Sequence, residues 1–226
     1  MNENLVGWYG KLPGLGDFVT KQLPEEFVKP WDSWLQEGML KGRSTFNEQW
    51  EEQYLTFPIW RFLIDKNVLG DQAWTGLLIP SADRVGRLFP LTIAVPVPAL
   101  SSTPDLKQLD LFLNELQVLA RQLLEDDLVE HFEASANALM ALFPMSNYRQ
   151  EEALLNMEQI GHTISIDPNE SLNDVFAGMA LRELLTRGIS RCFWWISPVD
   201  GHHGILRSAP SNLDAAFFVS LVSDLS

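Results

Sequence analysis

The chain has 226 residues, of which 46% are hydrophobic and 20% charged, a composition typical of a globular protein. Its 30 acidic and 16 basic residues leave a net charge of −14, which would repel nucleic acids and anionic membranes. Its apolar runs are far shorter than the roughly 20 residues of a membrane-spanning helix, and its first residues lack a signal-peptide pattern. The sequence therefore predicts a cytoplasmic protein with no nucleic-acid partner and no membrane insertion.

Two short strands and three helices are predicted in the first third of the chain. Apolar residues over 6–9 and 18–20 indicate strands joined by a glycine-rich loop. Pro24 and the acidic residues after it are typical of a helix start, and Pro30 is expected to kink or restart that helix. Ser44 and Pro58 are expected to begin two further helices, the latter containing Trp60 and Phe62.

Residues 74–97 predict a β-hairpin. Two apolar runs, 74–80 and 88–97, are rich in Leu, Ile and Val and flank the polar residues 81–87. Pro90 and Pro96 interrupt the second run, and proline in a sheet favours an irregular or edge position.

The remainder of the chain mixes helices and strands. In order, the patterns predict helices over 109–123 and 128–143, a strand at 162–166, a helix over 171–188, strands at 192–196 and 205–208, and a helix from Ser211. This interleaving predicts an α/β protein with a mixed or largely antiparallel central sheet and helices packed on its faces, an α-β-α sandwich.

The glycine-rich loop raises the question of phosphate binding. Gly10-Lys11 is followed by Leu12, without the hydroxyl residue of a phosphate loop, and Gly14-x-Gly16 has no third glycine. Asp17 would also repel a phosphate. We therefore expect a tight turn, in which Asp17 accepts hydrogen bonds from turn amides and Lys11 is solvated or ion-paired.

Other patterns for catalysis or metal binding are also weak. The adjacent His202 and His203 would point to opposite faces of a strand, which disfavours a shared metal. Cys192 is the one cysteine and lies in an apolar run, so a buried, inert thiol is expected. The sequence predicts no catalytic residue, no metal and no cofactor, and therefore no enzyme.

Charged residues 81–87 and the tryptophan pair have two interpretations each. The segment 81–87 would bind an anion or a partner, or it would be a hairpin tip held in shape by an ion pair, either Asp83–Arg87 or Asp17–Arg84. We favour the hairpin tip. Trp194 and Trp195 would point to opposite faces of a strand; both are buried if helices cover both faces, and otherwise one marks an interface.

Several strings resemble the signature of the TagF family. They are GWYGKLP at 7–13, GDFV at 16–19, LP at 23–24, FVKPWDSWL at 27–35, WRF at 60–62 and PSADRVGRLFPLT at 80–92. The resemblance is concentrated in residues 7–95 and implies one TagF-like domain over 1–226. It implies a cytoplasmic accessory protein of bacterial type VI secretion, which represses the apparatus after translation by binding a pathway protein such as the forkhead-associated scaffold.

Two other functions stay open alongside this one. The loops at 10–17 and 81–87 would serve a small-molecule or nucleotide sensor or enzyme if they met at a pocket, and the chain would otherwise be a structural subunit of the apparatus. Neither oligomeric state nor the binding face follows from the sequence. The candidate residues for structural or partner-binding roles are Lys11, Asp17, Trp31, Asp32, Arg61, Ser81, Asp83, Arg84 and Arg87.

Overall fold

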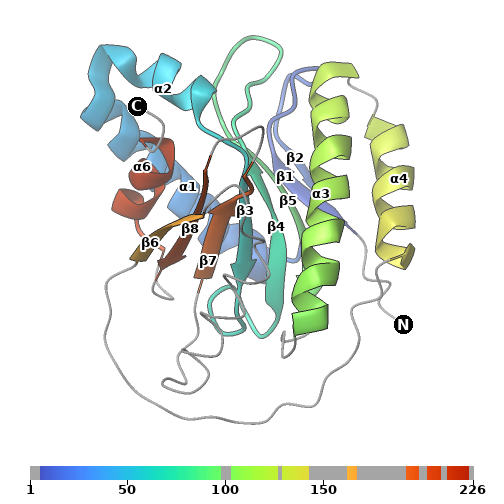
Figure 1. Ribbon diagram of the computed structural model, residues 1–226. Coiled ribbons are helices and arrows are strands. Elements are labelled where there is room, and N and C mark those ends of the chain that lie inside the picture. The colour runs from blue at the N-terminus through green and yellow to red at the C-terminus, as the bar shows by residue number, and fades with distance from the viewer. Residues whose placement is uncertain are drawn as a thin grey trace.

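A computed structural model of the chain describes residues 6–97, 103–126, 129–142, 162–166, 192–198, 203–209 and 213–223. Within these ranges, eight strands form one sheet in the order β2-β1-β5-β4-β3-β7-β8-β6 (Figure 1), and every neighbouring pair is antiparallel. The strands are β1 (Gly7–Gly10), β2 (Val19–Lys21), β3 (Trp60–Ile64), β4 (Ala73–Ile79), β5 (Leu91–Val97), β6 (His162–Ile166), β7 (Cys192–Ile196) and β8 (Gly204–Ala209).

Helices cover both faces of this sheet. One face carries α1 (Glu25–Phe46), α2 (Trp50–Thr56) and α6 (Ala215–Val222), and the other carries α3 (Thr103–Asp126) and α4 (Val129–Leu142) (Figure 1). A single 3-10 turn over Asn47–Gln49 joins α1 to α2. The predicted α-β-α sandwich with a largely antiparallel sheet is confirmed. The predicted helix over 171–188, the start at Ser211 and the residue His202 lie outside the described ranges.

Helix α1 begins after Pro24, as predicted, but it is not interrupted at Pro30. An interior proline costs about 3 kcal/mol. The same helix buries Phe27, Trp31 and Trp34 against the sheet, and each such side chain contributes about 1.5 to 3 kcal/mol. Burial therefore outweighs the proline penalty. The predicted helix start at Ser44 is also wrong, because that residue lies within the last turn of α1.

Residues 60–64 form strand β3 rather than the helix predicted from Pro58. The strand pairs with β4 on one side and β7 on the other, and Trp60, Phe62 and Ile64 are fully buried. A short apolar run without polar alternation does not separate a buried strand from a helix. The central position of β3 is set by partners distant in sequence.

The β4–β5 hairpin is confirmed, but β5 is not an edge strand. It pairs with β4 and also with β1, whose register ends at Gly7 opposite Ala94. Pro96 lies beyond that point and pairs with Trp74 of β4. Within the described residues, no strand pairs with β5 beyond Ala94 on the β1 side, where the N–H that proline lacks would otherwise be needed.

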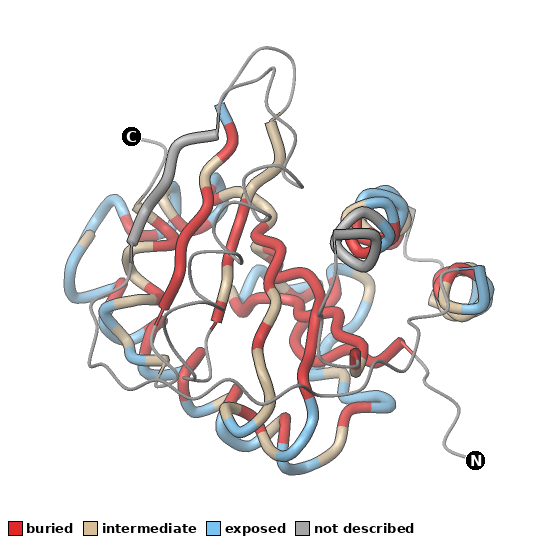
Figure 2. The backbone as a smooth tube through the Cα atoms, turned by 60° about the horizontal axis from the view of Figure 1, so that its bottom comes forward, coloured by how far each residue is buried: buried red, intermediate tan, exposed pale blue. Residues whose placement is uncertain are grey.

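The sheet separates two apolar cores. Figure 2 shows buried backbone mainly along the strands, with helices of mixed burial on both sides. Trp194 and Trp195 of β7 are both fully buried and belong to opposite cores. Trp194 stacks on Trp31 of α1, with ring centroids 5.8 Å apart. Next to this pair, Cys192 is buried, and burial together with the charge of Asp65 raises the pKa of its thiol to about 12. Both tryptophans thus serve the core, and the thiol is inert at neutral pH.

Candidate functional site

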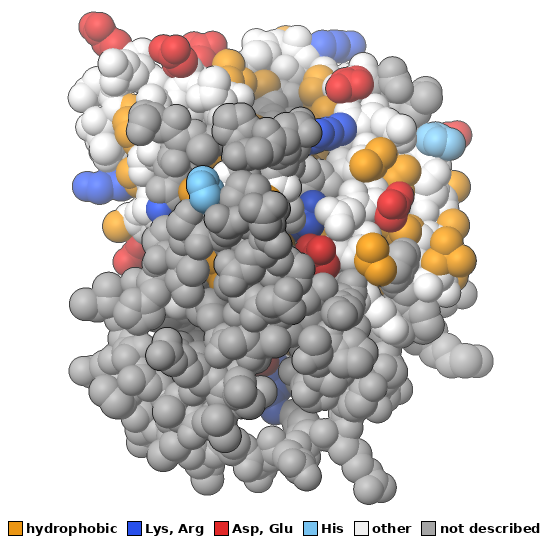
Figure 3. Space-filling model, viewed as in Figure 1, with side chains coloured by type: hydrophobic (Ala, Val, Ile, Leu, Met, Phe, Trp, Pro, Cys, Tyr) orange, Lys and Arg blue, Asp and Glu red, His pale blue; other side chains and the backbone are white. Residues whose placement is uncertain are grey.

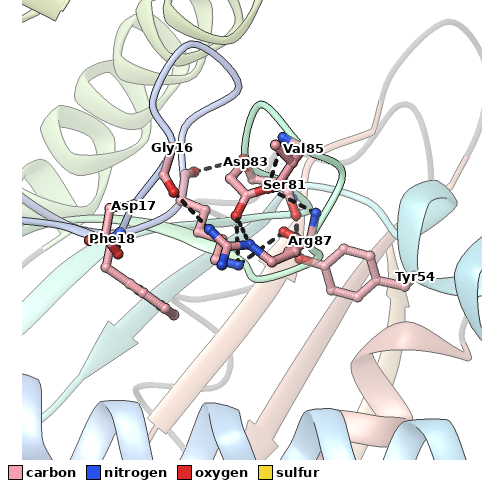
Figure 4. Close-up of polar contacts among 9 residues, drawn as sticks. Gly16, Asp17, Phe18, Tyr54, Ser81, Asp83, Val85 and Arg87 are labelled. Carbon is pink, nitrogen blue, oxygen red and sulfur yellow. Dashed lines mark hydrogen bonds and ion pairs between the residues drawn. The ribbon is translucent and has the colours of Figure 1, made fainter.

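Two loops far apart in sequence interlock at one end of the sheet (Figure 4). Residues 11–18 connect β1 to β2, and residues 81–88 lie between β4 and β5. They meet because β1 pairs with β5. Hydrogen bonds join them: Ser81 Oγ donates to the Lys11 carbonyl (2.8 Å), Arg84 N to the Leu15 carbonyl (3.2 Å), and Arg87 Nη2 to the Gly16 carbonyl (2.7 Å). We call these two segments the loop junction.

Asp83 lies at the centre of the loop junction, and its side chain is fully buried. Its Oδ2 is 3.0 Å from Lys11 Nζ and 2.6 Å from Arg87 Nε. Its Oδ1 accepts the backbone N–H groups of Val85 (3.1 Å) and Arg87 (2.9 Å). Burial alone raises the pKa of Asp83, but these donors outweigh burial and hold the pKa well below its usual range. The carboxylate is therefore an anion across the physiological pH range.

Lys11 is buried and ion-paired, which decides between the two states predicted for it. Its Nζ also donates to the Arg87 carbonyl (3.3 Å) and lies 5.1 Å from the centre of the Phe18 ring. Phe18 in turn packs edge-on against Phe89, 4.8 Å away. The ammonium group of Lys11 is thus engaged in contacts within the protein.

Gly10 is required by the close approach of two strands. Its φ of +133° disfavours other residues, and a Cβ atom here would lie 2.0 Å from the Pro90 carbonyl oxygen. Gly16, in the same loop, has no heavy atom within 4 Å of the equivalent position. The predicted tight turn with crowded backbones is therefore correct at Gly10.

A tyrosine of α2 holds the second loop, residues 81–88, in place. Tyr54 is fully buried; its hydroxyl donates to the Ser81 carbonyl (2.9 Å) and accepts the Ser81 N–H (3.2 Å). Burial raises the pKa of Tyr54 far above its usual value, so the phenol stays protonated. Sequence reasoning missed this contact because Tyr54 is 27 residues from Ser81 and carries no motif signal.

The remaining candidates near the loop junction act locally. Asp17 is exposed and accepts the Phe18 N–H (2.8 Å), as predicted for a turn. Of the two ion pairs considered, the structure forms Asp83–Arg87. Arg84 joins the loops through its backbone, while its side chain is exposed.

Trp31 and Asp32 connect α1 to the sheet outside the loop junction. Trp31 is fully buried, and its Nε1 donates to Thr92 Oγ1 (2.7 Å). Asp32 accepts the Tyr9 hydroxyl (2.5 Å). Burial, together with this bond to a carboxylate, raises the pKa of Tyr9 well above its usual value. Both residues therefore position α1 on the sheet.

Arg61 lies on the opposite face of the sheet from α1. It is buried, and its guanidinium donates to Gln117 Oε1 (3.1 and 3.0 Å), to Asp110 Oδ1 (3.1 Å) and to Asn114 Oδ1 (2.7 Å). Burial lowers the pKa of Arg61 and raises that of Asp110. The sequence analysis missed these acceptors, although their spacing of four and three residues puts them on one helix face. Arg61 therefore anchors α3 to β3.

The structure thus brings some of the candidates together and leaves Arg61 in a separate site. The loop junction combines Lys11, Ser81, Asp83 and Arg87, and the second site is built by Arg61 with three side chains of α3. In the described ranges, no three His, Cys, Asp or Glu side chains are grouped to hold a metal. The described helices also include none that is long and apolar enough to span a membrane. In both sites, buried charged side chains hold loops or helices in place.

The fold and these sites define an α-β-α sandwich whose charged residues hold its loops and helices in place. A family model described as the TagF N-terminal domain, type VI secretion system-associated, matches residues 7–139. The chain therefore belongs to the TagF family, and the resemblance of its signature strings is confirmed. Its role is that of an accessory to type VI secretion.

A solved structure supports this relationship along nearly the whole chain. The crystal structure of PA0076 from Pseudomonas aeruginosa PAO1 is 30% identical, with a TM-score of 0.65, and the match covers 98% of this chain and 95% of that one. No curated protein matched the sequence.

Proposed function

We propose that this protein is a non-enzymatic, cytoplasmic accessory protein that represses type VI secretion after translation. It would do so by binding a protein of the secretion pathway, such as the forkhead-associated scaffold. The observation that carries the proposal is the TagF family match over residues 7–139. Sequestration of a pathway protein requires a stable surface and no chemistry, which suits a chain whose candidate reactive groups are built into its fold.

The state of Lys11 and Asp83 supports a non-enzymatic role. A general base works best with a pKa near the operating pH, whereas the pKa of Asp83 lies well below its usual range. Lys11 is buried against that carboxylate, so its ammonium is unavailable as a nucleophile or phosphate ligand. The same interlocking argues against a sensor or enzyme that uses these two loops.

Deleting the gene in the native organism tests repression. We expect more secretion, measured as release of a secreted apparatus protein, without a change in the amounts of apparatus proteins. Affinity purification of the tagged chain from the cytoplasmic fraction, followed by mass spectrometry, should recover a secretion-system protein. Unchanged secretion would contradict the proposal. Loss of secretion, together with stoichiometric co-purification with assembled particles, would instead indicate a structural subunit.

A ligand screen by thermal shift tests the sensor alternative directly. We expect nucleotides and small anions to leave the melting temperature of the parent chain unchanged. A stabilisation that disappears in Arg87→Ala would show that the loop junction binds a small molecule and would overturn the non-enzymatic proposal.

A further inference from the structure

The loop junction exposes apolar side chains although its charged residues are buried. Leu15, Phe18 and Val85 are 36%, 45% and 69% exposed. They account for three of the eight large hydrophobic side chains exposed in the described part of the chain. The backbone bond from Arg84 N to the Leu15 carbonyl holds the two loop tips together. Leu15 and Val85 thus lie at the joined tips, whereas Phe18 points away from Val85 (Figure 4). Exposed apolar side chains that lie together mark interaction surfaces.

Two guanidinium groups accompany this apolar surface. Arg84 is exposed, and the Arg87 side chain is 60% exposed although its Nε contacts Asp83. The two loops carry three basic side chains, Lys11, Arg84 and Arg87, and two acidic ones, Asp17 and Asp83. Their formal charge is therefore +1, in a chain whose net charge is −14. Figure 3 shows acidic side chains scattered over both helical sides of the molecule. The loop junction is therefore locally basic on an acidic protein.

Screening makes this local charge the relevant one for a docked segment. At physiological ionic strength the Debye length is about 8 Å, so acidic side chains on distant helices contribute little. Guanidinium groups bind carboxylates through paired hydrogen bonds. The charges of Lys11 and Arg87 together exceed that of the buried Asp83 carboxylate, so this cluster does not make the loop junction acidic.

The surface is also rigid before any partner arrives. Ser81, Arg84 and Arg87 cross-link the two loops, and Tyr54 fixes the second loop to α2. A preorganised surface loses less conformational entropy on binding, so more of the contact energy becomes affinity.

We infer that the tips of the loop junction bind an acidic segment of a partner protein, one with carboxylate side chains beside apolar ones. Arg84 would receive a carboxylate, and Leu15 and Val85 the apolar side chains beside it. The inference rests on the proposed function, because it assigns the face through which the repressor holds its target. A second copy of the chain, which is also acidic, is the other occupant that the test distinguishes.

Site-specific photocrosslinking in the native cell tests this face. The full chain carries p-benzoylphenylalanine at position 85, and a matched chain carries it at position 40, where Leu40 is 66% exposed on α1. We expect position 85 to crosslink to a secretion-system protein, within a segment rich in Asp and Glu, and position 40 to give no such product. No product at position 85, a product with a basic segment, or one with a second copy overturns the inference. The deletion phenotype decides the proposed function separately.

Binding of the crosslinked segment, made as a labelled synthetic peptide, gives a quantitative test by fluorescence anisotropy. Arg84→Glu and Val85→Ser should each raise the Kd by about tenfold or more, while Leu40→Ser leaves it unchanged. A Lys in place of the peptide's carboxylate should restore binding to Arg84→Glu. Because these side chains are exposed, the variants should keep the parent's melting temperature. An unchanged Kd in both loop variants overturns the inference.

Discussion

At the scale of single residues, Asp83 shows how a buried charge is tolerated. Its carboxylate gives up water but receives two cations and two backbone N–H groups in return. Removing one partner from a buried ion pair is costly because the other charge stays buried and unpaired. Here Lys11 would be left in that state.

Asp83→Asn should therefore lower the melting temperature by several degrees. The control Asp17→Asn, at an exposed carboxylate, should change it little. The effect should depend on pH, because the folded pKa of Asp83 is depressed. Its stabilisation is fully present above the unfolded pKa of about 3.9 and is lost as the pH falls toward the folded value. Urea unfolding at several pH values between 7 and 3 gives the free energy of unfolding of parent and variant. The difference between these two free energies should narrow below about pH 4, and a difference that widens would contradict this account.

Gly10→Ala provides a second test at residue scale. The added methyl group would overlap the Pro90 carbonyl oxygen, and φ is unfavourable for alanine, so we expect a loss of about 3 kcal/mol or more in unfolding free energy. Gly16→Ala, six residues along the same loop, should be nearly neutral or slightly stabilising. Equal losses in the two variants, measured by chemical denaturation, would show that strand approach is not what requires Gly10.

At the scale of elements, Arg61 determines how α3 sits on the sheet. One guanidinium reaches three acceptors spaced along one side of the helix, which fixes both the rotation and the height of α3. Lysine has a single point charge and cannot satisfy this set of acceptors.

Arg61→Lys should accordingly cost about 1 to 3 kcal/mol in unfolding free energy, since buried acceptors lose their donors. Arg121→Lys, at an exposed position on α3, is the matched control and should have little effect. Hydrogen exchange should also rise along α3 in the first variant alone. A stability equal to that of the parent would mean that apolar packing suffices to place the helix.

Local signals in the sequence predicted some elements well and others poorly. The β4–β5 hairpin and α1 were predictable because proline, acidic residues and apolar runs mark them directly. Strand β3 was not, because the identity of Trp60–Ile64 as a strand depends on pairing with β4 and β7, the latter about 130 residues away. The Asp83–Arg87 pair was predictable from its spacing, whereas the pairing of Lys11 with Asp83 needed β1 beside β5.

At the scale of the whole molecule, the sheet divides the apolar interior into two cores. Neighbouring tryptophans on β7 enter one core each, so a single strand supports both layers of helices. Among the described residues, each helical layer packs on its own cluster of side chains.

Paired substitutions should reveal this division. Trp194→Phe and Trp195→Phe should each reduce unfolding free energy by about 1 to 3 kcal/mol. Native-state hydrogen exchange should then rise first in α1 for the former, which loses its stacking on Trp31, and first in α3 for the latter. The same exchange pattern in both variants would indicate that the two cores open as one unit.

The buried thiol of Cys192 makes the chain a convenient substrate for labelling. With one cysteine in the sequence, shielded by β7 and its neighbours, thiol reagents should modify the native protein only as fast as it opens. A cysteine introduced at an exposed position would then be the one fast-reacting group. Dyes or spin labels can therefore be attached at single sites without removing the native cysteine, and the slow modification of Cys192 itself reports the rate at which the protein opens.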